Sequence, residues 1–252
     1  MLTERNKMTE TLITDIAKRL LNPQDKLSDE LFDYAENLLP YAREELLNIA
    51  LFFHKQIFED FEDLKICDIC LTGSMAGYTY HEKSDIDIRI IIQNKTSFLT
   101  KDAKRFEEFL SCLSGLYYHT GFKPYFNNRF VDIKMSSRQV DLLGNYSLLK
   151  NKWVVYPSQK YAKQISYQEL IDAYENRRTK ITKDIEDLRN KYNGCILAEK
   201  LDNYYYNQVS SNVKIKDYLV FKLLNYAQII KPIGAESIRT YNESLSLKLK
   251  QD

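Results

Sequence analysis

Glycine and proline, the residues that most often interrupt regular structure, are scarce, with 7 and 5 copies in 252 residues. With 44% hydrophobic and 28% charged residues, the composition excludes collagen-like, low-complexity and disordered chains. No apolar run approaches the length of a membrane span, and the charged N-terminal sequence MLTERNKMTE lacks the apolar core of a signal peptide. We therefore expect a globular, cytoplasmic protein that makes no contact with membranes.

Cysteine is scarce as well, with four residues in the chain. Cys67 and Cys70 form a CxxC motif, but no second pair of Cys or His residues lies at the spacing of a zinc site. Residues 65–72 have the apolar pattern of a strand, so we interpret both cysteines as buried strand residues. No zinc is expected.

Charge is unevenly distributed, although the whole chain carries a net charge of only +1. Residues 1–149 contain 18 Lys and Arg against 23 Asp and Glu, and residues 150–252 contain 18 against 12. An acidic part that binds metal and a basic part that meets phosphates would give this distribution. A chance imbalance over solvated helices would give it too.

The N-terminal quarter of the chain has helical periodicity. We expect residues 1–62 to form helices that pack on the core that follows. Residues 28–30 (Ser-Asp-Glu) can cap a second helix, and residues 41–61 place Leu46 and Phe53 on one apolar stripe.

The periodicity then changes twice. Residues 63–157 contain short apolar strands and one helix, which predicts an α+β core, and Asn127-Asn128 is typical of a hairpin turn. Residues 158–252 return to helical spacing and predict an all-helical C-terminal domain. Residues 154–160, around a proline, are the expected linker.

One predicted strand carries two acidic side chains on the same face. Residues 84–93 alternate, so Asp85 and Asp87 leave the strand together, about 7 Å apart. Carboxylates this close repel each other unless cations lie between them, and Mg²⁺ prefers such oxygen ligands. Two ions about 3.5–4 Å apart could hold the attacking and leaving oxygens of a displacement at phosphorus.

A Gly-Ser turn precedes this strand. Gly73 would let the backbone approach a phosphate closely, and Ser74 adds a hydroxyl and an N–H for a triphosphate oxygen. Taken alone, an Asp/Ile alternation is usually a solvated strand face, and a Gly-Ser pair is usually a plain turn. Their occurrence together between apolar strands favours a site for phosphate chemistry.

The stretch LTGSMAGYTYHEKSDIDIRIII resembles the signature of the DNA polymerase β-like nucleotidyltransferase superfamily. The resemblance implies a mixed, strongly twisted β-sheet with flanking helices, and a third carboxylate on a later strand. Asp132, in the sequence FVDIK, matches that position, with Asp141 as the alternative. Asp85 and Asp87 would bind two Mg²⁺ or Mn²⁺ ions, while Asp132 would bind the catalytic ion and help to deprotonate an acceptor hydroxyl.

The reaction implied by the resemblance moves a nucleoside monophosphate from an NTP, such as ATP, to a hydroxyl acceptor and releases pyrophosphate. Thr79 and Lys222 are further candidates for nucleotide contacts, although a plain loop threonine and a solvated lysine would look the same. Residues 145–154 and 218–224 resemble parts of predicted nucleotidyltransferases of tailed bacteriophages. If the protein is encoded by a phage, its place is the host cytoplasm.

Several alternatives stay open at this stage. The acceptor could be an RNA end, a protein side chain, a second nucleotide or a small molecule such as an aminoglycoside, and a two-domain cleft would hold the nucleotide. RNA is compatible with the basic C-terminal part. A different class is a catalytically silent fold of the same family, used as a binding or antitoxin-like module. A purely helical scaffold leaves the Gly-Ser and Asp-x-Asp motifs unexplained.

Overall fold

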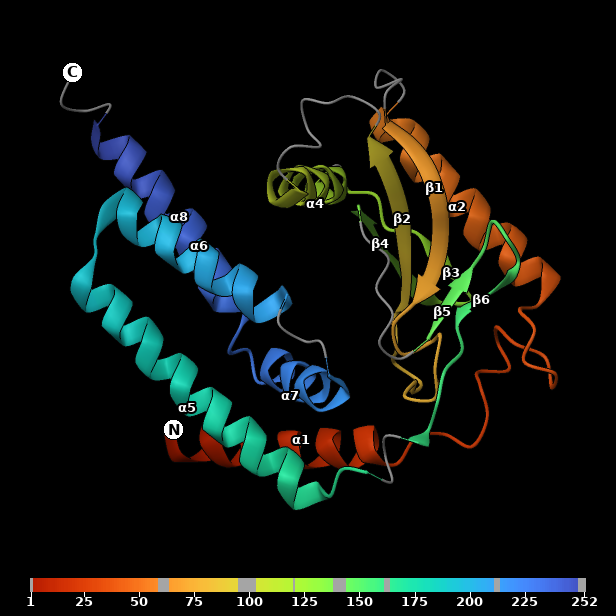
Figure 1. Cartoon of the computed structure of the whole chain (residues 1–252), viewed down its shortest axis with the longest axis horizontal. Coiled ribbons are helices and arrows are strands. Elements are labelled where there is room, and N and C mark those ends of the chain that lie inside the picture. Colours follow the sequence, from red (N-terminus) through yellow and green to blue (C-terminus); the bar gives the residue numbers. More distant parts are fainter. Residues whose placement is uncertain are drawn as a thin grey trace. The chain divides into compact units, whose positions relative to one another are not determined.

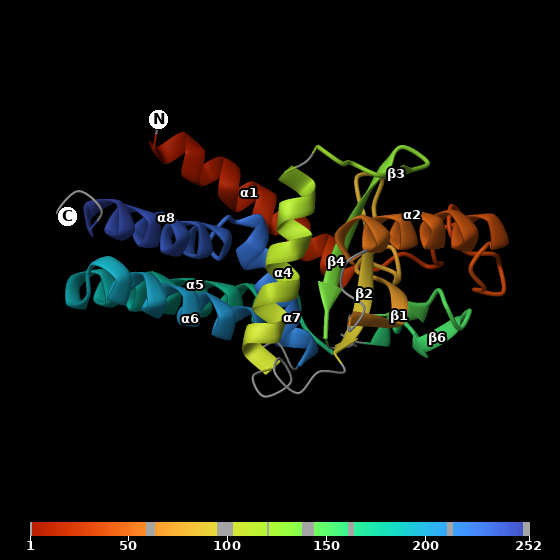
Figure 2. The same cartoon turned by 90° about the horizontal axis from the view of Figure 1, so that it is seen from above.

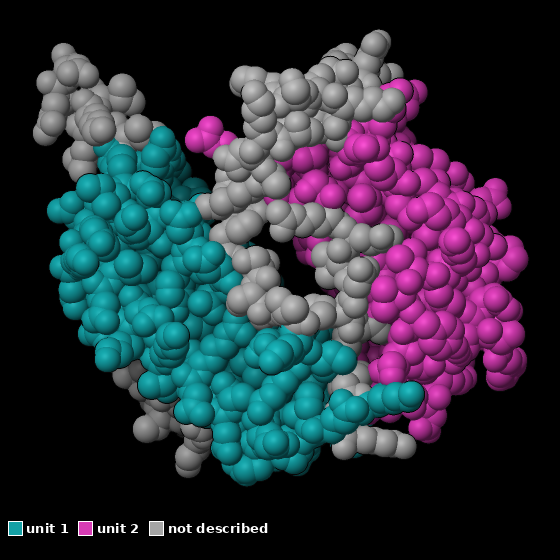
Figure 3. Space-filling view, in the orientation of Figure 1, with its two compact units in different colours: residues 1–22, 160–252 teal, residues 23–159 magenta. Residues whose placement is uncertain are grey.

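The computed structural model describes residues 2–58, 64–94, 103–119, 121–137, 144–160, 164–210 and 214–248. The chain forms two compact units (Figures 1 and 3). One comprises residues 23–159 and is called the sheet unit. The other comprises residues 1–22 and 160–252 and is called the helical unit.

The sheet unit is built on six strands in the order β3-β4-β2-β1-β5-β6. The pair β2 and β4 is parallel, and the other neighbouring pairs are antiparallel, so the predicted mixed sheet is confirmed. The strands are β1 (Leu64–Thr72), β2 (Ile86–Asn94), β3 (Tyr125–Phe126), β4 (Arg129–Ser136), β5 (Asn145–Ser147) and β6 (Lys152–Val155).

Two helices accompany this sheet. The helix α4 (Ala103–His119) follows β2 and precedes β4, as expected for a crossover between parallel strands. The helix α2 (Pro40–Phe58) lies against the sheet (Figure 1), and its residues Leu46 and Phe53 are fully buried in one cluster with Ile88 of β2. The apolar stripe read from residues 41–61 is therefore the contact that α2 makes with the sheet.

The predicted hairpin turn is also present. Asn127 and Asn128 join β3 to β4, and their φ angles of 47° and 63° are both in the left-handed region. A two-residue turn with this geometry matches the right-handed twist of the flanking strands, and asparagine tolerates it better than most residues. The turn sets the first residue of β4 at Arg129.

The segment between the N-terminal helix and α2 differs from the expectation. Residues 23–39 form turns and a short β-bridge between Phe32 and Leu38, and the helix predicted after residues 28–30 is absent from them. Ser28 does start a turn, because its carbonyl accepts the N–H of Leu31 and of Phe32. The turn ends there. The Asp33 carboxylate then accepts hydrogen bonds from the N–H groups of residues 35 and 37.

The helical unit contains α1 (Leu2–Leu21), α5 (Tyr167–Lys191), α6 (Gly194–Ser210), α7 (Ile215–Tyr226) and α8 (Lys231–Lys248). Within it α6 runs beside α8, and α1 contacts α5 and α7 (Figures 1 and 2). All elements in the described residues 164–210 and 214–248 are helices, which is consistent with the predicted helical C-terminal domain.

The N-terminal helix is assigned to the helical unit. The packing of residues 1–62 on the core stays a prediction, while residues 1–22 belong to that unit. The reason is the apolar stripe of α1, whose Ile13, Ile16 and Leu20 are buried. Periodicity predicts that such a stripe is covered, but not by which partner.

The two cysteines of the CxxC motif lie on β1, as predicted, but only Cys70 is buried. Cys67 is exposed, so its predicted burial is wrong. The pairing of β1 with β2 is interrupted by a β-bulge between Ile66 and Asp68, and Cys67 is the residue at this irregularity. No helix among the described residues combines the length and the apolar character that a membrane crossing requires.

The packing of α2 gives a first prediction. Leu46→Ala should lower the free energy of unfolding of the sheet unit by about 2–5 kcal/mol, because it leaves a cavity under a fully buried side chain. Leu51→Ala, on the same helix but 43% exposed, should cost less than about 1 kcal/mol. Urea unfolding followed by the fluorescence of Trp153, the chain's single tryptophan, reports on this unit. Equal losses in both variants would contradict the packing.

Candidate functional site

Strand register brings the three predicted carboxylates together. Asp85 directly precedes β2, Asp87 lies on β2, and Asp132 lies on β4. In the parallel pairing of these strands Asp87 is opposite Asp132. Neighbouring strands are about 4.8 Å apart, and opposed residues project from the same face, so the two side chains are adjacent.

The opposite face of the same strands is apolar and covered. Ile86 and Ile88 of β2 and Val131 and Ile133 of β4 are at most 1% exposed. Because side chains alternate along a strand, burial of these four residues commits the aspartates to the other, accessible face. A shift of the register by one residue would bury the carboxylates, which the hydrophobic face prevents.

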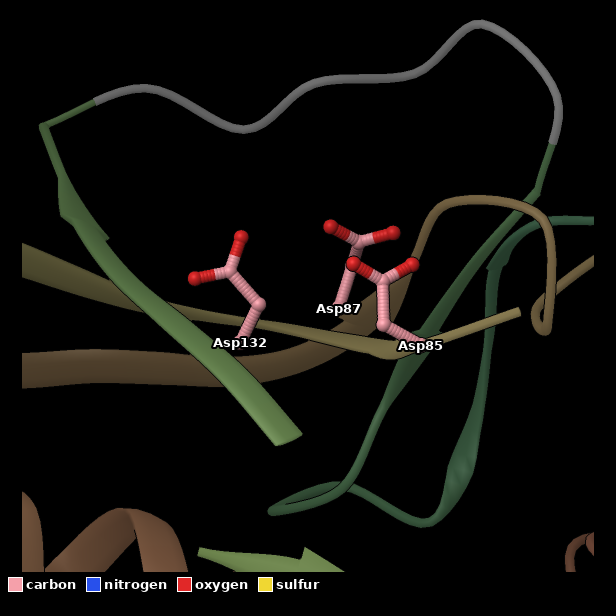
Figure 4. A group of neighbouring side chains, drawn as sticks. All are labelled: Asp85, Asp87 and Asp132. Atoms are coloured by element: carbon pink, nitrogen blue, oxygen red, sulfur yellow. The ribbon is translucent and has the colours of Figure 1, made fainter. Parts of the chain in front are cut away.

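The carboxylates converge on a common space. One oxygen from each of Asp85, Asp87 and Asp132 lies within 4.8 Å of the others (Figure 4). Asp85 is exposed and the other two are half-buried. Among the described residues this is the only group of three His, Cys, Asp or Glu side chains with such spacing. An all-oxygen set of three anions fits a hard divalent cation such as Mg²⁺ or Mn²⁺, and it does not fit zinc well.

A lysine already contacts one of the carboxylates. The Lys134 Nζ lies 2.6 Å from Asp132 Oδ2, and the side chain of Lys134 is 55% exposed. Burial lowers the pKa of the Lys134 ammonium, but the carboxylates of Asp132 and Asp87 outweigh burial and raise the pKa above its ordinary value of 10.5. Arg89 is opposite Lys134 in the strand pairing. A row of two basic side chains therefore follows the acidic row on this face.

Gly73 lies against the acidic group for a steric reason. Its φ is +75°, and a Cβ atom built on it would lie 1.9 Å from Asp87 Oδ2. No residue with a side chain could hold this turn so close to the carboxylate. The sequence indicated a close approach to phosphate at Gly73, and the structure adds a close approach to Asp87.

Two other predicted site residues, Ser74 and Thr79, lie in the loop that follows Gly73. Ser74 is half-buried in the turn after Gly73, and its carbonyl accepts the N–H of Gly77. The Thr79 hydroxyl is shielded from solvent and has no hydrogen-bond partner among the described residues. A contact with nucleotide would need a local change in this loop, so nucleotide binding by Thr79 stays a prediction.

The described residues of the sheet unit do not include two of the predicted residues. Lys222 is on α7 of the helical unit, with its Nζ 5.3 Å from the centre of the Tyr218 ring, and its role stays a prediction. Asp141, the alternative third carboxylate, lies outside the described residues.

The sequence did not indicate two basic residues that contact this site. Lys134 had a usable signal, because it is two positions from Asp132 on a strand and shares its face. Arg129 also contacts the loop ahead of Asp85, through the carbonyls of residues 81, 82 and 84. It had no such signal, since its carboxylate partner, Glu30, is 99 residues away in sequence.

Comparison with known proteins agrees with this geometry. Residues 54–141 match the family described as "Nucleotidyltransferase domain". The matched segment contains Gly73 and all three aspartates of the acidic group, and it supports the predicted superfamily. No curated protein and no solved structure matches the chain significantly. The similarity to bacteriophage proteins therefore stays a resemblance.

The fit of Gly73 against Asp87 gives a second prediction. Gly73→Ala should displace the Asp87 carboxylate and lower the affinity for Mn²⁺ by about tenfold or more, as measured by the free Mn²⁺ signal in electron paramagnetic resonance. Gly121→Ala is the matched control, because Gly121 also has a positive φ, of +87°, but open space around its Cβ position. Both variants should lose about 1–2 kcal/mol of stability to the backbone conformation. Unchanged Mn²⁺ affinity in Gly73→Ala would contradict the steric argument.

Proposed function

We propose that this protein is a metal-dependent nucleotidyltransferase, which moves a nucleoside monophosphate from an NTP to a hydroxyl acceptor and releases pyrophosphate. The observation that carries the proposal is the convergence of Asp85, Asp87 and Asp132 in a segment that matches the nucleotidyltransferase domain family. The match by itself supports a transferase reaction at a general level. The three carboxylates make the metal-dependent form of that reaction the best-supported one.

The acidic group would hold the metal ions. Asp85 and Asp87 would contact two Mg²⁺ or Mn²⁺ ions, and Asp132 one of them. When bound, the ions neutralise the triphosphate and lower the pKa of the acceptor hydroxyl. The Lys134 ammonium group is paired with Oδ2 of Asp132 at 2.6 Å in the structure, so an ion would either share this carboxylate with Lys134 or displace it. A displaced Lys134 would turn toward solvent or toward a phosphate oxygen.

The remaining residues would orient the reactants. The backbone and hydroxyl of Ser74, beside Gly73, would donate to triphosphate oxygens, with Thr79 and Lys222 as further nucleotide contacts. Asp132 would accept the proton of the acceptor hydroxyl, whose oxygen forms a bond to the α-phosphorus. The bond between the α-phosphorus and the bridging oxygen breaks, and pyrophosphate leaves with its electron pair. The acceptor stays open between an RNA end, a protein, a nucleotide and a small molecule.

One observation favours a second candidate, a catalytically silent binding module. The ion pair between Lys134 and Asp132 already compensates one of the three negative charges without any metal. The presence of all three carboxylates on one face argues for the enzyme, because a silent module has no need of this repulsion. The two candidates differ in whether nucleotide and metal bind together.

The third prediction tests the activity directly. Incubation with each of the four α-labelled NTPs, Mg²⁺ or Mn²⁺, and either total RNA or lysate protein should transfer label to one acceptor class. The paired variant Asp85→Ala/Asp87→Ala should lose at least about a hundredfold in rate, because each metal contributes several kcal/mol to the transition state. Asp172→Asn, which changes an exposed aspartate on α5 of the helical unit, should leave the rate unchanged.

The same samples separate the enzyme from the silent module. NTP with Mg²⁺ should raise the melting temperature of the wild type, because a ligand that binds only the folded state stabilises it. A wild type with no labelled acceptor, and no product formed from NTP alone, would refute the transferase.

A further inference from the structure

The loop that leads into the acidic group is irregular and needs support from elsewhere. Residues 73–85 join β1 to β2 through turns, so no strand pairing fixes the backbone directly ahead of Asp85. Its hydrogen bonds to itself are local: Gly77 N donates to the Ser74 carbonyl at 3.1 Å, and in the last turn Ser84 N donates to the His81 carbonyl and His81 N donates to Ser84 Oγ, both at 3.0 Å. These bonds do not connect the last turn to the start of β4, the strand that carries Asp132.

Arg129 makes that connection. Its Nη1 donates to the carbonyl oxygens of His81, Glu82 and Ser84 at 3.1, 2.9 and 2.9 Å. Three carbonyls of one turn thus meet one guanidinium group, whose side chain is only 12% exposed. Arg129 is the first residue of β4, three positions before Asp132. One side chain therefore ties the start of β4 to the turn that ends at Asp85.

The other edge of the guanidinium is held by Glu30. Arg129 Nε donates to Glu30 Oε2 at 2.7 Å, and Nη2 donates to Glu30 Oε1, which completes a two-point pair. The hydrogen bond to Arg129 holds the pKa of the Glu30 carboxyl below its ordinary 4.5, so the pair is ionised at neutral pH. Because Glu30 binds the Nε and Nη2 edge of the planar guanidinium group, the orientation of Nη1 toward the turn is fixed.

The segment around Glu30 holds the same loop at a second point. Gln24 N donates to the Tyr78 carbonyl at 2.7 Å, and the Tyr78 hydroxyl donates to Glu36 Oε1 at 2.9 Å. Burial and this hydrogen bond raise the pKa of Tyr78 to about 12, so the hydroxyl remains a donor. Residues 24–36 lie outside the segment 54–141 that matches the family. The loop is thus supported by a part of the chain that the match does not include.

We propose that Arg129 is a positioning residue of the metal site, which together with Glu30 fixes residues 81–84 so that Asp85 joins the strand-held Asp87 and Asp132 before an ion binds. The proposal rests on the proposed function for the identity of the ion, but not for the contacts. It differs from a purely structural role in one respect. Loss of Arg129 should act on the loop and on ion affinity more than on the stability of the sheet unit.

The test compares three variants by Mn²⁺ affinity and by hydrogen exchange of the amides of residues 81–87 without metal. Arg129→Gln should weaken Mn²⁺ binding about tenfold or more and speed the exchange, as expected when a partner that orients metal ligands is removed. Arg129→Lys should do nearly the same, because an ammonium cannot bridge the glutamate and three carbonyls together. Glu30→Gln should have a smaller effect in the same direction.

Arg189→Gln is the matched control. It breaks another two-point pair, between Arg189 and Glu236, in the helical unit. Its Mn²⁺ affinity and its exchange at residues 81–87 should equal those of the wild type.

The outcomes separate the proposals. Wild-type affinity and exchange in folded Arg129→Gln and Arg129→Lys would overturn the positioning role. If both variants lose the folded fluorescence of Trp153, Glu30→Gln decides, and unchanged values there overturn the role as well. If the wild type itself binds no Mn²⁺, the proposed metal dependence fails, while exchange in the absence of metal still tests Arg129.

Discussion

The parallel pairing of β2 with β4 sets two acidic side chains opposite each other, so their mutual repulsion has to be offset by other interactions in the site. Asp87 and Asp132 are held by apolar burial on the far side of the sheet, where Ile86, Ile88 and Ile133 cannot leave the core without a large loss. The hydrophobic effect therefore holds like charges in proximity. Lys134 offsets part of the repulsion at Asp132.

Much of this arrangement could be predicted from the sequence, because it depends on local alternation. The Asp/Ile pattern of β2 and the apolar neighbours of Asp132 fix which face each carboxylate occupies. The Asn127-Asn128 turn fixes where β4 begins. The order of the strands and the register of Asp87 against Asp132 could not be predicted, since no local rule selects a partner strand. The resemblance to a family implied only a mixed sheet and a third carboxylate on a later strand.

Contacts distant in sequence could not be predicted. Glu30 and Arg129 are 99 residues apart, and neither lies in a motif. The irregular segment 23–39 has helix-capping residues, yet its polar groups make hydrogen bonds to distant parts of the chain. The Glu36 carboxylate accepts from Tyr78 in the loop before β2, and the Glu36 carbonyl accepts from Nε1 of Trp153. Tertiary contacts override helix propensity here. For α1 the sequence has a similar limit, because an apolar stripe does not identify what covers it.

The compact sheet unit is larger than the segment that matches the family. The match covers residues 54–141, but the sheet continues through β5 and β6, and residues 23–53 supply most of α2 and the supports of the acidic loop. Gly73 has no side chain and so leaves room for the Asp87 carboxylate, whereas the side chain of Arg129 binds the turn before Asp85. In the proposed metal site, both residues set the geometry before an ion binds. Divalent ions would then gain affinity, because the fold has already ordered the carboxylates and overcome their mutual repulsion, which is the physical meaning of a preorganised site.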